Sequence, residues 1–155
     1  MTDEARTAQA DLRRYKDAKR DIRDMADKIN ALQARINSTT SRLKEISIQS
    51  SSQQSKEELI CILADLRDEY CRQQCEAEKV MYEIELKISE IGNGLYRRIL
   101  RNYYLYNQTF EQIAVSESLC YDYITNSHRR ALDRYYRVLQ RHVDKCSFQT
   151  VINNP

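Results

Sequence analysis

The sequence predicts an all-α protein in which a long antiparallel coiled-coil hairpin is followed by a compact helical head. The 155 residues include only two glycines, Gly92 and Gly94, and a single proline, Pro155. Because the turns of β-sheets depend on Gly and Pro, a chain this poor in both favours helices joined by few connections. Apolar residues also recur every three or four positions over most of the chain, which is the spacing of helices with one buried side.

A narrow apolar stripe runs through the first third of the chain. Its members alternate spacings of three and four residues: Tyr15, Ala18, Ile22, Met25, Ile29, Leu32 and Ile36, with Leu43 and Ile46 continuing the series. A stripe only one or two residues wide is typical of a coiled-coil contact, and it is narrower than the face that a helix presents to a globular core. The sequence therefore predicts one long helix in this region.

A polar run, IQSSSQQS, separates this stripe from a second one. Ser55 followed by Glu57 and Glu58 is typical of a helix start, because acidic side chains are favourable near the N-terminal end of the helix dipole. The second stripe has the same spacing: Leu59, Leu63, Leu66, Tyr70, Gln73, Ala77, Val80, Ile84, Ile88 and Ile91. Two such helices joined by a polar turn predict an antiparallel hairpin. Because two narrow stripes make a thin core, the hairpin either self-associates or packs on the C-terminal helices. We expect a homodimer or a higher oligomer.

The segment EIGNGLYRR holds both glycines and predicts the boundary between the two parts of the chain. We expect a helical arm over residues 1–92 that assembles subunits or binds a partner, a head over residues 93–147, and a tail over residues 148–155. Within the head, apolar spacing predicts helices at about 95–106, 109–116 and 119–145.

The middle of the head has the pattern of a helix-turn-helix motif. Thr109 followed three residues later by Gln112 predicts a capping box, which starts a short helix. SESLC is a short polar turn. A small Ala114 allows a second helix to cross closely, and the following stripe gives that helix an inward side. The expected inward residues are Phe110, Ile113 and Ala114, then Tyr123 or Ile124, Ser127, Ala131, Leu132 and Tyr135.

Charge is distributed unevenly along the chain. Residues 1–93 carry 16 basic and 18 acidic side chains, whereas residues 94–155 carry 9 basic and 5 acidic ones. Eight of the 11 tyrosines also lie in the second part, and its basic residues are arginines except for Lys145. Arg and Tyr both suit contact with phosphates and bases, through paired hydrogen bonds and planar stacking. The asymmetry favours a nucleic-acid partner for the head.

The segment LRNYYLYNQTFEQIAVSESLCYDYITNSHRRAL resembles region 4 of bacterial sigma factors, in which S-x-x-E-I-A, a turn and a recognition helix ending H-R-A-L follow a Leu-rich helix. The whole layout resembles the phage late-transcription regulators of the RinA/ArpU type, which combine a helical N-terminal region with a sigma-like helix-turn-helix. Glu117 and Ser118 stand where the family usually has Leu-Gly, and Cys120 stands where a Ser or Thr usually caps the recognition helix. Ser118 is therefore expected to cap that helix instead.

The resemblance implies which residues contact double-stranded DNA. By position, the recognition surface consists of Tyr121, Asp122, Thr125, Asn126, Arg129 and Arg130, with Ile124 and Leu132 in the core. Asn can bond adenine and Arg can bond guanine in the major groove. A weaker set for phosphate contact consists of Arg98, Arg101, Gln108, Thr109 and Arg134, and the arginines that continue this helix, Arg137 and Arg141, are either phosphate contacts or solvated.

Other sites have simpler interpretations. His128 is expected to pack or to make a structural hydrogen bond. Cys61, Cys71 and Cys75 are expected to be small core residues, because their spacing is not that of a zinc site, and His142 with Cys146 provides only two ligands. No phosphate-binding glycine loop or catalytic motif is present, so we expect neither an enzyme nor a cofactor or metal. The sequence has no apolar run long enough to cross a membrane, and five cysteines without an export signal favour the cytoplasm of a bacterial host.

The expected function is a transcription regulator of phage or mobile-element type that binds DNA sequence-specifically and controls late gene expression. The resemblance to sigma factors adds the option that it works beside RNA polymerase. Two alternatives stay open. The first is a helical interaction protein that binds and redirects a host protein through its helix-turn-helix or its arm. The second, which the charge asymmetry disfavours, is a purely structural coiled-coil protein.

Overall fold

The structure is a computed structural model that describes the backbone of residues 2–43 and 56–152, and the side chains of residues 2–38 and 56–144. Its elements are α1 (Asp3–Leu43), α2 (Lys56–Ser89), α3 (Gly94–Leu100), a π-helical turn η1 (Arg101–Leu105), α4 (Phe110–Glu117) and α5 (Tyr121–Ile152). The predicted all-α class is confirmed, and no strand occurs in these ranges. The interpretations placed on Leu43, Ile46, Ser55 and Cys146, and on the polar run before Ser55, lie outside the described side chains.

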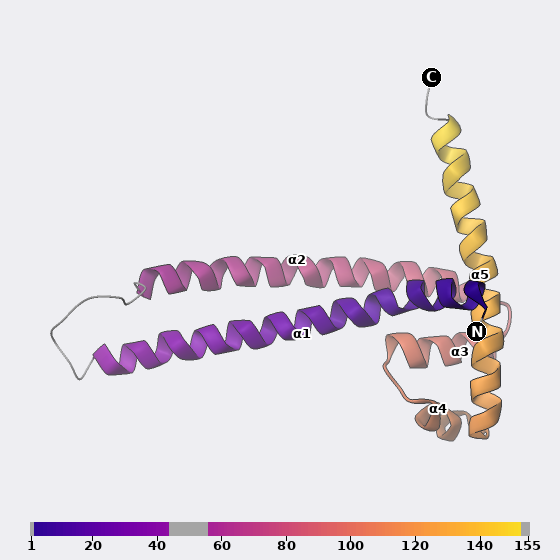
Figure 1. Cartoon of the computed structure of the whole chain (residues 1–155), viewed down its shortest axis with the longest axis horizontal. Coiled ribbons are helices and arrows are strands. Elements are labelled where there is room, and N and C mark those ends of the chain that lie inside the picture. The colour runs from indigo at the N-terminus through magenta and orange to yellow at the C-terminus, as the bar shows by residue number, and fades with distance from the viewer. Residues whose placement is uncertain (1, 44–55, 153–155) are drawn as a thin grey trace. The chain divides into compact units, whose positions relative to one another are not determined.

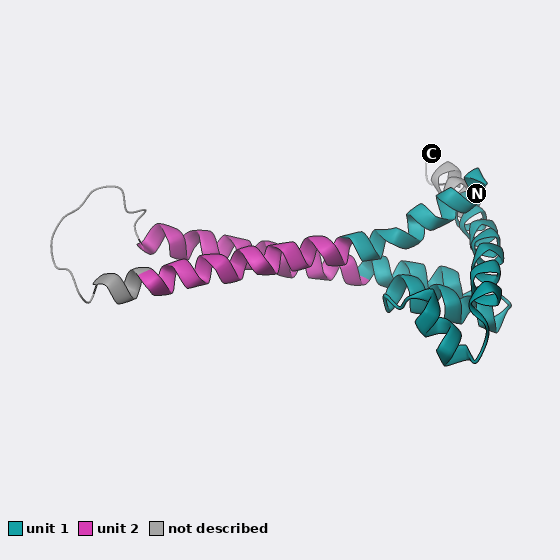
Figure 2. Cartoon of the chain, turned by 60° about the horizontal axis from the view of Figure 1, so that its bottom comes forward, with its two compact units in different colours: residues 1–17, 79–155 teal, residues 18–78 magenta. Residues whose placement is uncertain are grey.

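The chain divides into two compact units, which Figure 2 colours separately. Unit 1 comprises residues 1–17 and 79–155, and unit 2 comprises residues 18–78. The head predicted for residues 93–147 lies within unit 1. This unit also takes in the first turns of α1 and the last turns of α2, both of which the sequence analysis had assigned to the arm.

Unit 2 is built from the parts of α1 and α2 that it contains, and Figure 2 shows them side by side. Leu32 and Ile36 of α1 pack with Leu59 and Leu63 of α2, and all four side chains are buried. The Arg67 guanidinium donates a hydrogen bond to the Gln33 side chain at 3.0 Å beside this cluster. The contact joins the two predicted apolar stripes, while the coiled-coil geometry itself stays a prediction.

The prediction that cysteines fill the core of this region is wrong. Cys61, Cys71 and Cys75 are all exposed, as is Cys120 in the head. They lie between the buried positions Leu59, Leu63 and Ala77 of α2, on other sides of the helix. Cysteine is often buried, but whether a side chain on a helix is buried depends on its position relative to the apolar stripe. Near these cysteines the buried positions of α2 are occupied by Leu and Ala.

The first turns of α1 contribute to the core of unit 1. Ala5, Ala8, Leu12 and Tyr15 are all buried, and they share one side of the helix at spacings of three and four residues. Ile84, Ile88 and Ile91 of the α2 end are buried in the same unit. Arg14 approaches Glu83 at 3.5 Å and Asp11 approaches Lys87 at 2.9 Å, so within this unit the two segments run in opposite directions.

A half-buried ionic group joins three helices of unit 1. The Asp11 carboxylate of α1 pairs with the Lys87 ammonium of α2 and accepts a hydrogen bond of 2.7 Å from the Tyr135 hydroxyl of α5. Arg14 donates to its other oxygen at 3.1 Å. Burial alone would raise the pKa of the Asp11 carboxyl, but the hydrogen bonds from Lys87 and Tyr135 outweigh burial and lower this pKa.

Asp11→Asn is expected to lower the free energy of unfolding by about 2 kcal/mol, because the amide keeps the shape but leaves the Lys87 ammonium half-buried without a counter-charge. Unfolding in urea, followed by circular dichroism, measures the change. Asp3→Asn is the matched control, since Asp3 is almost fully exposed in its pair with Arg6. Equal losses from the two variants would contradict a structural role for Asp11.

Candidate nucleic-acid interface

Helix α4, the first helix of the predicted helix-turn-helix, begins at a complete capping box. The Gln112 backbone N–H donates to the Thr109 hydroxyl at 3.3 Å, and the Thr109 backbone N–H donates to the Gln112 side chain at 2.9 Å. These two bonds satisfy donors that a helix start leaves unpaired. The capping box predicted from the sequence is confirmed, and it fixes where α4 begins.

The turn after α4 depends on a left-handed residue. Ser118 has φ 56 and ψ 40, and its N–H donates to the Val115 carbonyl at 3.2 Å. The Leu119 N–H donates to the Ala114 carbonyl at 2.9 Å, which completes a Schellman motif. The prediction that Ser118 caps the recognition helix is therefore wrong, because Ser118 ends α4. The residue directly before α5 is Cys120, whose carbonyl accepts from the Ile124 N–H at 3.1 Å.

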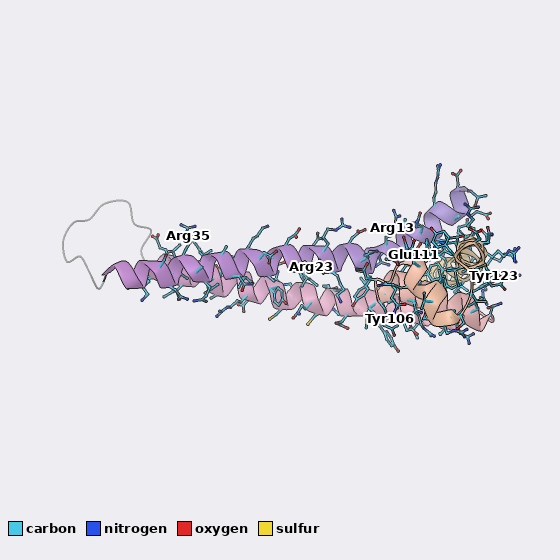
Figure 3. All side chains as sticks on the ribbon, turned by 90° about the horizontal axis from the view of Figure 1, so that it is seen from below. Arg13, Arg23, Arg35, Tyr106, Glu111 and Tyr123 are labelled. Carbon is cyan, nitrogen blue, oxygen red and sulfur yellow. The ribbon has the colours of Figure 1, made fainter. Side chains whose placement is uncertain are left out.

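A small apolar cluster decides which side of α5 faces inward. Ile99 of α3, Ile113 and Ala114 of α4, and Ile124 of α5 are buried against one another. Of the two alternatives for this position, Ile124 is the inward residue, while Tyr123 is 48 % exposed on the outer side of the helix (Figure 3). The remaining predicted inward residues of α5 are also buried: Ser127, Ala131, Leu132 and Tyr135.

Aromatic rings surround this cluster. Tyr103 stacks on Phe110 with ring centroids 4.4 Å apart and meets Tyr104 edge-on at 4.9 Å. Tyr104 is 1 % exposed, whereas Tyr106, at the end of the π-helical turn, is 66 % exposed and points into solvent (Figure 3). Tyr103 and Tyr104 therefore lie at the core or its edge, whereas Tyr106 does not.

His128 is a packing residue, as predicted. Its ring stacks near Tyr104, and Nε2 lies 3.2 Å from the Tyr104 hydroxyl, which makes a buried hydrogen bond. Burial, with a smaller contribution from the positive charge of Arg129, lowers the pKa of His128 to about 4. The imidazole is therefore neutral at neutral pH. Burial likewise raises the pKa of the Tyr104 hydroxyl, which keeps its proton.

The six residues of the predicted recognition surface gather on the outward side of the first turns of α5. Five of them are exposed and Thr125 is half-buried, with its hydroxyl donating to the Asp122 carbonyl at 3.0 Å. Tyr121 is 46 % exposed, and its ring meets Phe110 edge-on at 6.5 Å. Within the described residues, no ion pair or hydrogen bond involves the side chains of Asn126, Arg129 or Arg130. Amide and guanidinium donors there remain available to a ligand.

Two of the predicted phosphate contacts are engaged inside the protein. The Arg98 guanidinium binds both carboxylate oxygens of Glu117 at 2.6–3.0 Å, and hydrogen bonds from Arg98 lower the pKa of the Glu117 carboxyl. The Arg101 guanidinium binds Glu85 in the same way at 2.8 and 3.0 Å. These pairs hold α3 to the end of α4 and η1 to α2, so any phosphate there would compete with a carboxylate.

The other predicted phosphate contacts differ in availability. The Gln108 backbone N–H donates to the Asn102 carbonyl at 2.8 Å, and that of Thr109 is used by the capping box. The Gln108 side-chain oxygen is buried without a hydrogen-bond partner among the described residues. Arg134 is exposed and has no ion pair with any other described residue. Arg134 is thus the most available member of this set.

Glu85 and Glu117, the acidic partners of Arg101 and Arg98, were not predicted from the sequence. They lie 16 and 19 positions away from their arginines, so no helical periodicity connects them. Their carboxylates balance the charges of the Arg98 and Arg101 guanidinium groups. Among the described side chains, those of residues 2–38 and 56–144, no group of three or more His, Cys, Asp or Glu could hold a metal ion. No helix in the described part of the chain is long and apolar enough to cross a membrane.

Helix α4, the turn at Ser118 and the first turns of α5 thus follow one another as the helix-turn-helix prediction expects, and Ile99 of α3 packs with them. Comparisons with protein families, with characterised proteins and with solved structures find no match for this chain.

Ser118→Gly is expected to raise the free energy of unfolding by about 1 kcal/mol, because glycine has no Cβ to clash in the left-handed conformation. The measurement is thermal or urea unfolding of the full chain. Ser116→Gly provides the contrast: this residue lies inside α4 and its hydroxyl donates to the Ile113 carbonyl, so its replacement is expected to destabilise by about 1 kcal/mol. Destabilisation by both variants would contradict the strained turn.

Stability is expected to fall as the pH is lowered from about 6.5 to about 4. An unfolded His128 binds a proton near pH 6.5, whereas the folded one does so only near 4, so acid favours the unfolded chain in this window. The loss is about 3 kcal/mol at most. His128→Gln should flatten the dependence of unfolding free energy on pH. Arg23→Gln, at an exposed position of α1, should keep it because arginine does not titrate in this window. An unchanged slope in His128→Gln would rule out this origin.

Proposed function

We propose that the chain is a transcription regulator of phage or mobile-element type that binds double-stranded DNA sequence-specifically, controls late gene expression and acts in the cytoplasm of a bacterial host. The observation that carries the proposal is the outward face of α5, where Asn126, Arg129 and Arg130 are exposed and have no partner among the described residues. The first turns of a recognition helix carry such side chains into the major groove.

The positions of the other arginines also support the proposal. Arg98 and Arg101 are bound by carboxylates, so the cationic surface near the turn is concentrated on α5 itself. Tyr121 and Thr125 add groups that can touch a thymine methyl or a phosphate beside the base contacts. A surface with a few base-reading side chains and additional cations is what sequence-specific binding requires.

Self-association through α1 and α2 is part of the same proposal. A homodimer would present two recognition helices to half-sites separated by whole turns of the duplex. The resemblance of the motif to region 4 of sigma factors adds RNA polymerase as a proposed partner. The stoichiometry of the DNA complex tests whether the protein binds as a homodimer.

A second candidate function has its own observation. Val115 is 81 % exposed and Leu119 is 37 % exposed beside the turn, and Tyr121 and Tyr123 are about half exposed at the start of α5. Apolar and aromatic side chains clustered on a surface suit a protein partner better than a phosphate backbone. The alternative is therefore an interaction protein that binds and redirects a host protein through this end of the motif.

The full-length protein is expected to bind a mixed-sequence duplex library with an affinity that falls steeply with salt, because Lys and Arg release counterions from DNA. Asn126→Ala and Arg129→Ala should each cost about 1–3 kcal/mol on the selected site and relax its sequence preference. Fluorescence anisotropy over a salt series measures both effects. Arg23→Gln, an exposed residue of α1 (Figure 3), is the control and should change neither affinity nor preference.

Absence of salt-dependent binding to any duplex would overturn the DNA proposal. If the protein still binds a host protein in that case, and Val115→Asp abolishes this binding, the alternative of an interaction protein is favoured.

A further inference from the structure

Unit 1 contains a groove whose lining residues differ from those of the proposed base-reading face. It has a volume of about 660 Å³ and is bounded by the segment between α2 and α3, by Tyr96 of α3 and by the middle of α5. Its apolar wall includes Ile91 and Val138, which are 3 % and 2 % exposed. None of the six residues of the recognition surface lines it.

Three arginines of α5 form one side of the groove. Arg134, Arg137 and Arg141 follow one another at spacings of three and four residues, so they share one flank of the helix. In the described part of the chain, Arg134 and Arg137 have no ion-pair or hydrogen-bond partner. Two guanidinium groups on a groove wall without counter-charges attract an anion.

The single acidic residue of the lining is already engaged. One Glu90 oxygen lies 3.5 Å from the Arg141 guanidinium and the other lies 2.7 Å from Nε2 of His142. The carboxylate thus occupies Arg141 and leaves the other two arginines free. With three cations and one anion, the lining carries an excess of positive charge.

We propose that this groove binds a phosphate ester. A guanidinium fork matches two phosphate oxygens, and two adjacent forks can hold one phosphate or a diphosphate. The phenol ring of Tyr96 and the apolar wall beside it accommodate the organic part of the ester. The volume is that of a site for a ligand of nucleotide size. The phosphate comes either from a free nucleotide or from a DNA strand beside the recognition helix.

Titration of the full-length protein with adenosine diphosphate, pyrophosphate and adenosine tests the site. Both phosphates should bind and adenosine should not, as followed by calorimetry and by amide shifts around Tyr96. The double variant Arg134→Gln/Arg137→Gln should weaken binding at least about tenfold, because it removes two charge-assisted contacts. Glu90→Gln should tighten binding by about threefold or more, because it removes the only negative charge and releases Arg141. Arg23→Gln should leave the affinity unchanged.

A second titration with duplex DNA distinguishes the two sources. Binding of the small phosphates without any effect of the double variant on DNA affinity assigns the groove to a free nucleotide. A loss of DNA affinity in the double variant, without binding of small phosphates, assigns it to the DNA strand. Where small phosphates bind, Asn126→Ala should leave that binding intact. Where only DNA binds, Asn126→Ala should relax the sequence preference, whereas the double variant should lower the affinity for all duplexes, so failure of the base-reading face is recognised separately.

Three results would overturn the proposal. The first is that neither small phosphates nor DNA respond to the double variant. The second is that Arg23→Gln weakens binding as much as the double variant does, which would indicate attraction to positive charge in general. The third is that Glu90→Gln weakens binding. Unchanged helicity of each variant by circular dichroism excludes unfolding as the cause of a loss.

Discussion

The contact of Ile124 with Ile99, Ile113 and Ala114 determines what α5 presents to solvent. Successive residues of a helix are 100° apart, so burying Ile124 also sets the direction of every neighbour on the first turns. Asn126 and Arg129 face outward because the apolar cluster holds the opposite side. Ala114 is small enough to let the two helices approach, and a larger side chain there would push α5 away from the cluster. Apolar packing thus creates the polar surface on which the proposed DNA contact depends.

Features that depend on neighbouring residues were predictable from the sequence. The capping box joins Thr109 to Gln112, the inward stripe of α5 repeats every three or four residues, and His128 lies on that stripe. Features that depend on residues far apart in the chain were not. From the sequence, Arg98 and Arg101 were predicted to be available for phosphate contact. In the structure they are paired with Glu117 and Glu85. The exposed cysteines of α2 were misjudged because a residue type, and not its place on the helix, was used to predict burial.

The extent of unit 1 shows a different limit. Ala5, Ala8 and Leu12 continue the apolar stripe of α1 toward its beginning, although the stripe was predicted to begin at Tyr15. The alanines bury little surface and give a weak signal, whereas Leu12 has the spacing and size to be included. Asp11 looked like an ordinary surface carboxylate. Its pairing with Lys87 and Tyr135 joins residues 76 and 124 positions apart and makes the start of α1 part of the same compact unit as the helix-turn-helix.

The π-helical turn between α3 and the following loop has a consequence for the side chains on either side of it. Buried residues occur in adjacent pairs, Ile99 with Leu100 and Tyr104 with Leu105, and the pairs are five positions apart. The Tyr106 N–H correspondingly reaches the Arg101 carbonyl five residues back, at 3.0 Å. An ordinary helix would place the second pair about 140° around from the first. The wider turn lets both pairs face the same core. Its one extra residue per turn offsets the rotation about the helix axis that an ordinary helix would place between the two pairs.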